Sequence, residues 1–184
     1  MSSPEEILLQ RTLRVMQIAA SGLLMGLVIF LTIVLIIVQI KNQGAGLAPP
    51  GNFPLISIVA VLFFALQGPL AFIAPGIQTG KGLRKIATGT WQLPPGADPS
   101  AFKSDASKLL VLRQNTMLSR LAILEGAGFF GCIAYLVEGR MIALSEILVV
   151  LFLMLMSFPT YYRMRYWREL QTDRLIQLRQ DAAS

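Results

Sequence analysis

The sequence contains no histidine and only one cysteine, Cys132. Histidine is the commonest protein ligand of haem iron, zinc and non-haem iron, so we expect neither a metal site nor a metal-dependent cofactor. A single thiol cannot form an internal disulfide, and its place in an apolar run favours a small packing residue over a reactive thiol. Because the usual pairs of nucleophile and base are also missing, we expect a protein that is not an enzyme.

Charged residues are scarce as well, at 14% of the chain against 54% hydrophobic residues. This balance lies outside the range of ordinary water-soluble domains. The longest polar stretch, residues 76–115, has about 40 residues, which is near the lower size limit for independent folding. We therefore predict a single membrane domain over residues 1–184, without an added water-soluble domain.

Four long apolar runs are the main feature that the sequence does contain. They cover residues 15–40, 54–74, 118–137 and 141–162. Each run has about 20 residues, which in a helix with a rise of ~1.5 Å per residue crosses the roughly 30 Å hydrocarbon layer of a bilayer. The predicted fold class is an all-α integral membrane protein, with four transmembrane helices in an antiparallel bundle.

The basic residues are distributed unevenly around these runs. Of the 16 Lys and Arg residues, all but Lys41 and Arg140 lie before the first run, between the second and third runs or at the start of the third (Arg120), or after the fourth. The positive-inside rule then places both termini, and a long loop over residues 76–117, in the cytoplasm. We expect residence in the cytoplasmic (inner) membrane with both termini inside.

The same basic residues indicate what the chain contacts. They cluster beside the ends of apolar runs, which favours the anionic headgroups of a lipid bilayer over nucleic acid as the partner. The candidates for headgroup contact are Lys81, Arg84, Lys85, Arg163, Arg165 and Arg168.

Several local signals predict helix ends. Pro75-Gly76 is expected to end the second helix, and the glycines at 80, 82 and 89 favour an irregular loop. The string from Gly76 to Gly82 departs from a phosphate-binding loop, because its spacing is one residue short and Gly82 replaces Ser or Thr. Asp98-Pro99 predicts the start of an interfacial helix that leads into the third span.

The tail, residues 163–184, mixes five arginines with apolar residues. An amphipathic surface helix, a partner-binding helix and a frayed continuation of the fourth helix are all consistent with this pattern.

Two glutamates lie within apolar runs, where an ionised side chain costs roughly 2.5–3.5 kcal/mol. At the helical rise, Glu125 falls at the level of Gln67, and Glu146 at the level of Thr32 and Ser57. Each glutamate is therefore expected to join a small hydrogen-bonded layer. Such layers either hold helices together, at about 0.6–2 kcal/mol per bond, or form stations in a proton or cation path.

Small residues mark candidate faces for helix packing. Gly22 and Gly26 form one GxxxG pair in the first span, and Gly128 and Gly131 lie on one side of the third. Together these features predict a multi-pass structural, accessory or scaffolding subunit that forms a homo-oligomer or joins other membrane subunits. The alternative is a small proton or cation carrier that uses Glu125 and Glu146.

Overall fold

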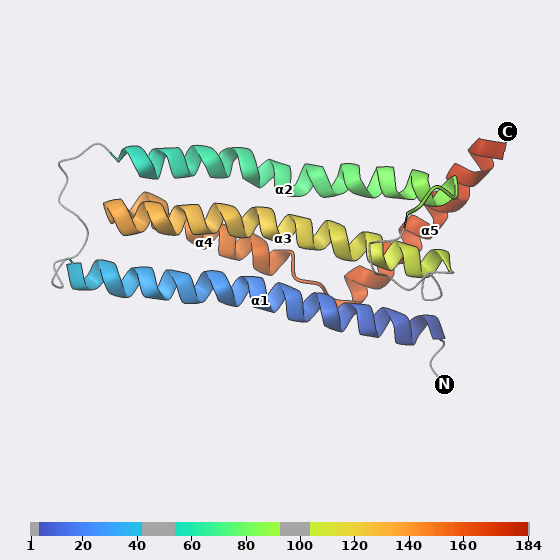
Figure 1. Ribbon diagram of the computed structural model, residues 1–184, viewed down its shortest axis with the longest axis horizontal. Helices are drawn as coiled ribbons and strands as arrows, with labels where there is room; N and C mark the ends of the chain where they lie inside the picture. Colours follow the sequence, from blue (N-terminus) through green and yellow to red (C-terminus); the bar gives the residue numbers. More distant parts are fainter. Residues whose placement is uncertain (1–3, 42–53, 93–103, 184) are drawn as a thin grey trace. The chain divides into compact units, whose positions relative to one another are not determined.

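The computed structural model describes residues 4–41, 54–92 and 104–183. These residues form five helices and no strand: α1 (Pro4–Lys41), α2 (Leu55–Ala87), α3 (Asp105–Glu138), α4 (Met141–Met156) and α5 (Tyr161–Ala183) (Figure 1). Among them α1, α2 and α3 are long and apolar enough to cross a membrane, and α4 with α5 counts as a fourth candidate if this bent pair forms one span. The prediction of a helical protein with long apolar spans is thus confirmed, while the number of four spans and their orientation stay predictions.

Apolar side chains surround α1 rather than following one face. Its buried stripe recurs every three or four residues, as shown by Leu27, Leu31 and Val34. The other side of the same helix exposes large apolar side chains such as Ile29 and Ile36, each 54% exposed. A helix that is apolar all round is typical of a membrane span, where lipid covers the outer face.

The expectation that α2 ends at Pro75-Gly76 is wrong, because α2 continues to Ala87. Proline lacks the N–H that would bond the carbonyl four residues earlier, here that of Ala71. In the structure the Arg120 Nε–H donates to this carbonyl oxygen at 3.3 Å. The helix ends at Ala87, two residues before Gly89, which has a positive φ of 72° and takes the left-handed conformation that glycine tolerates after a helix C-terminus.

The helix α3 begins with a capped first turn. The Ser107 N–H donates to Ser104 Oγ at 3.2 Å, which satisfies one of the free N–H groups at the helix start. Residues 76–87, which the sequence assigned to an irregular loop, are helical, whereas the helix expected to lead into the third span is present as residues 105–117 of α3. The expected helix start at Asp98-Pro99 lies outside the described residues.

The tight turn between the third and fourth apolar runs is confirmed. The helix α3 ends at Glu138, Gly139 has a positive φ of 62°, and α4 begins at Met141. Gly128 lies against Val150, and Gly131 lies against Ile147. The later residue of α3 thus contacts the earlier residue of α4, so the two helices are antiparallel.

The fourth apolar run is not one continuous helix. After α4 ends at Met156, Pro159 cannot continue an i to i−4 ladder, and a new helix begins at Tyr161. The tail is therefore a separate helix, so the interpretation as a continuation of the fourth helix is wrong. Along α5 the buried side chains are Met164, Gln171 and Leu175, a helical spacing that gives the tail one packed face.

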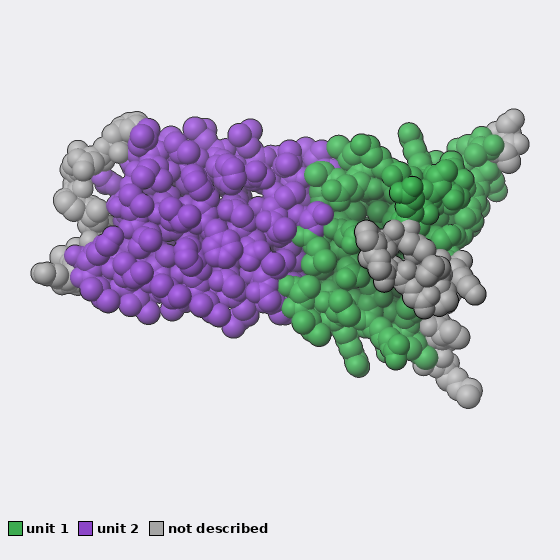
Figure 2. Space-filling view, in the orientation of Figure 1, with its two compact units in different colours: residues 1–19, 74–118, 159–184 green, residues 20–73, 119–158 purple. Residues whose placement is uncertain are grey.

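The chain forms two compact units, coloured separately in Figure 2. Unit 1 comprises the described residues within Met1–Ala19, Ala74–Leu118 and Pro159–Ser184, and unit 2 comprises Ala20–Ile73 and Ser119–Phe158. The single membrane domain expected over residues 1–184 stays a prediction.

Each unit has its own packed interior. In unit 1, apolar side chains of α2, α3 and α5 form a buried cluster that includes Ile86, Leu109 and Leu175. In unit 2, α3 contacts α1 through Phe129 and Phe30, and contacts α2 through Phe130 and Phe63, with 5.1 Å between ring centroids in both pairs. The third helix is thus the central element of unit 2, since α4 packs on it as well.

Candidate functional site

Glu146 is the most unusual polar residue of unit 2. Its side chain is only 4% exposed, and neither carboxyl oxygen has a hydrogen-bond partner among the described residues. A Cβ built on Gly131 would lie 3.5 Å from the Glu146 carboxyl carbon and from Oε1, so the carboxyl group packs against α3 at this glycine. A larger residue at position 131 would collide with Ile147 and crowd the carboxyl group.

The expectation that Thr32 and Ser57 join Glu146 in a hydrogen-bonded layer is wrong. Thr32 uses its hydroxyl within α1, where Oγ1 donates to the Val28 carbonyl at 2.8 Å. Ser57 is fully buried, but its hydroxyl donates to Glu138. The helical rise predicts a similar depth for Thr32, Ser57 and Glu146, but it does not predict the direction in which each side chain points.

Glu138 caps the start of α2, a role that the sequence did not reveal. Its carboxylate accepts the Ile56 N–H at 2.7 Å, the Ser57 N–H at 2.9 Å and the Ser57 hydroxyl at 2.6 Å. A carboxylate here satisfies free N–H groups and meets the positive end of the helix dipole. Partial burial acts to raise the pKa of Glu138, but the hydrogen bonds from Ser57 and Ile56 and the charge of Arg140 outweigh it and lower that pKa.

Glu125 lies elsewhere in unit 2, half-buried beside α1. A Cβ on Gly26 would be 3.5 Å from Glu125 Oε1. Gly131, against which Glu146 packs, is six residues further along α3, so the two glutamates are offset by about 9 Å along that helix. Gln67, the third polar candidate, is half-buried on α2. The structure therefore places the two carboxyl groups at separate positions rather than in one site.

The four glycines expected to serve helix packing have different surroundings. A Cβ on Gly128 would lie 2.6 Å from Leu27 Cδ2 and 3.2 Å from Val150 Cγ1. Gly128 therefore lets α1 and α4 approach α3, and Gly131 and Gly26 also adjoin side chains of neighbouring helices. Gly22 differs, because a Cβ there would meet nothing within 4 Å. Its face is free to contact another molecule.

The basic candidates in unit 1 divide into two groups. Lys81 and Lys85 line a pocket of about 490 Å³ at the end of α2, whereas Arg84 does not line it, although all three residues are exposed. On α5, Arg163 and Arg165 are exposed, and Arg165 forms an ion pair with Glu169 at 3.0 Å. These arginines and lysines remain candidates for headgroup contact.

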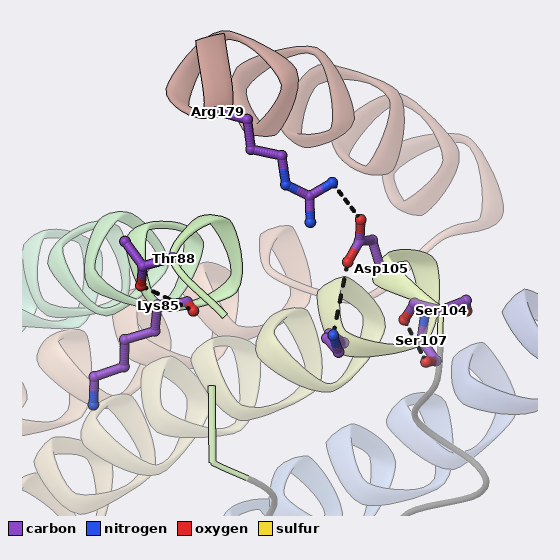
Figure 3. Close-up of polar contacts among 7 residues, drawn as sticks. Lys85, Thr88, Ser104, Asp105, Ser107 and Arg179 are labelled. Carbon is purple, nitrogen blue, oxygen red and sulfur yellow. Dashed lines mark hydrogen bonds and ion pairs between the residues drawn. The ribbon is translucent and has the colours of Figure 1, made fainter. Parts of the chain in front are cut away.

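The remaining basic candidate, Arg168, lines a second pocket of about 470 Å³ between α3 and α5. Three carboxylates, those of Asp105, Glu169 and Asp173, line the same pocket. Figure 3 shows Arg179 reaching Asp105, with 2.8 Å between the charged atoms. Charges of both signs thus compensate one another at this position.

Among the described residues, no group of three or more His, Cys, Asp or Glu side chains is arranged to hold a metal ion. Comparison with known protein families, with curated proteins and with solved structures finds no match.

Proposed function

We propose that this chain is a self-associating scaffold or accessory subunit of a membrane, most simply of the cytoplasmic (inner) membrane with both termini inside. One observation carries the proposal, namely the outer face of α1 in unit 2. Gly22, Met25, Ile29 and Ile36 are all exposed there, and the large side chains are each more than half exposed. These positions follow one another at intervals of three, four and seven residues, so they form one continuous stripe.

A period of three and four residues is the spacing at which two helices stay in contact along their length. Glycine within the stripe lets a second backbone approach closely. The van der Waals packing that this approach permits is one of the forces that hold helices together in lipid. The occupant that we propose for this face is α1 of a second copy. The basic residues at the helix ends support the proposed orientation through the positive-inside rule.

The proposal is tested by measuring energy transfer between labelled copies in vesicles. Gly22→Leu should raise the apparent dissociation constant of the dimer about tenfold, which corresponds to about 1.4 kcal/mol. Gly76→Leu is the matched control, because a Cβ on Gly76 also meets nothing within 4 Å but lies on α2. A strictly monomeric protein, or an equal effect of both substitutions, would contradict the proposal.

A carrier of protons or cations is the second candidate, and the buried carboxyl group of Glu146 favours it. An unpaired carboxyl group inside a span is costly and is often kept for transport. Flux of protons and of Na⁺ into vesicles tests this candidate with Glu146→Gln and, separately, Glu125→Gln. Equal flux in the two variants and the unsubstituted protein removes both glutamates from any transport mechanism.

A further inference from the structure

The pocket at the end of α2 is formed by a close approach of two helices in unit 1. A Cβ on Gly82 would lie only 2.5 Å from Leu112 Cδ1, so a larger residue here would force the Leu112 side chain of α3 to shift. Beside this contact a cavity of about 490 Å³ opens, and Gln78, Lys81 and Lys85 of α2 line it on one side. Asn115 of α3 lines the other side, and Trp91 and Gln92 follow the end of α2. The six side chains thus come from two helices and a connecting segment.

The lining has the chemistry of a site for an anion. Lys81 and Lys85 are one helical turn apart and therefore project from the same face of α2; Figure 3 shows Lys85 extending from that helix. Gln78, Gln92 and Asn115 add amide N–H donors, and no aspartate or glutamate is among the described residues that line this pocket. The second pocket of unit 1 differs, because three carboxylates line it beside its arginines.

The position of the pocket along α2 indicates where the anion comes from. With 33 residues, α2 is about 50 Å long, which exceeds the roughly 30 Å hydrocarbon layer. If the apolar run to Ala74 fills that layer, the backbone of Lys81 and Lys85 lies about 10 and 16 Å beyond it, on the aqueous side of a headgroup layer about 5–7 Å deep. Helical side chains tilt toward the helix N-terminus, which here is toward the bilayer, so the two ammonium groups extend back toward the headgroups.

We infer that this pocket binds the phosphate group of an anionic glycerophospholipid. The two ammonium groups neutralise the phosphate, and the amides of Gln78 and Asn115 donate hydrogen bonds to its oxygens. Basic pockets between helices at the membrane boundary bind anionic headgroups in this way. A zwitterionic headgroup fits less well, because no carboxylate lines the pocket to pair with its amine. This inference is independent of self-association through α1.

Native mass spectrometry of the full-length protein in mild detergent provides the test, with phosphatidylglycerol and phosphatidylcholine added in competition. We expect phosphatidylglycerol to be retained about tenfold more strongly. Lys81→Gln and Lys85→Gln should each weaken its binding about fivefold, since one basic residue contributes about 1 kcal/mol near an anionic surface. Asn115→Leu should weaken it without any change of net charge.

Arg84→Gln is the matched control, because it removes the same charge from the same helix but at a residue that does not line the pocket. The affinity of this variant for phosphatidylglycerol should stay within twofold of the affinity of the unsubstituted protein. Equal losses in Arg84→Gln and Lys81→Gln would overturn the inference, since they indicate a diffuse basic surface. A parallel titration with soluble glycerol 3-phosphate distinguishes the sources of phosphate. Binding of that compound without any preference for phosphatidylglycerol would overturn the assignment to a lipid.

Discussion

Arg120 completes the hydrogen bonding of a helix that contains proline, and this role can be measured. Its Nε–H donates to the Ala71 carbonyl at 3.3 Å, and its guanidinium lies 4.8 Å from the centre of the Phe72 ring. A hydrogen bond from a charged group contributes about 1.5–3 kcal/mol, and the length of this one favours the lower end. The contact with Phe72 adds about 0.5–2 kcal/mol. Arg120→Met should therefore lower the free energy of unfolding by about 2–3 kcal/mol.

The hydrogen bond can be separated from the ring contact by changing Pro75. In Pro75→Ala the new backbone N–H can bond the Ala71 carbonyl directly, so the Arg120 donor becomes redundant. In that background Arg120→Met should lower the free energy of unfolding by only about 1 kcal/mol, the part due to Phe72. The expected coupling between the two substitutions is about 1–2 kcal/mol, within the range for residues that share a partner.

Reversible unfolding of the purified protein in mixed micelles, with rising denaturing detergent, provides these free energies. Pro69→Ala is the matched control, because Pro69 is also inside α2 but blocks the bond to a different carbonyl, that of residue 65. In the Pro69→Ala background, Arg120→Met should still lower the free energy of unfolding by about 2–3 kcal/mol. Equal effects of Arg120→Met with and without Pro75→Ala would refute the role that we assign to Arg120.

Three further predictions concern residues whose contacts are described above. Glu138→Gln should lower the free energy of unfolding by about 1–2 kcal/mol at pH 7. Because the folded pKa of Glu138 lies below its ordinary value of 4.5, this contribution is present above pH 4.5 and disappears as the pH falls through the folded pKa, so the difference should vanish in acid. Gly128→Leu should destabilise unit 2 by about 1–3 kcal/mol in the same unfolding assay, whereas Gly22→Leu should not. Asp105→Asn should change the stability by less than about 1 kcal/mol, because its ion pair with Arg179 is partly open to solvent; a greater loss would show a tighter network.

The long apolar spans were predictable because their signal is local and strong. A run of about 20 apolar residues has few other stable structures, and Gly139 gave a clear turn between α3 and α4. The extension of α2 was not predictable in this way. Pro75 is a helix breaker by every local rule, but the group that completes the helix, Arg120, lies 49 residues from the Ala71 carbonyl to which it donates.

The candidate sites show the same limit. Glu146 could be found because a charge within an apolar run is visible in one dimension. Glu138 was missed as a cap because it appeared to be an ordinary charge in a turn, and its partner Ser57 lies 81 residues away. Lys81 and Lys85 were found as basic residues, but nothing in the sequence distinguished them from Arg84. The pocket beside Gly82 makes that distinction, because Lys81 and Lys85 line it and Arg84 does not.

Glu146 remains the position where stability and function are expected to disagree. A buried polar group that lacks a hydrogen-bond partner lowers the free energy of unfolding by about 1–3 kcal/mol. Leucine has a similar size and no such penalty, so Glu146→Leu should raise the stability by about that amount in mixed micelles. Loss of stability would instead show that the carboxyl group has a partner in the membrane, which would contradict the isolation described here. A residue that lowers stability is retained only if it contributes something else, so a stabilised Glu146→Leu variant with reduced ion flux would favour the carrier over the scaffold.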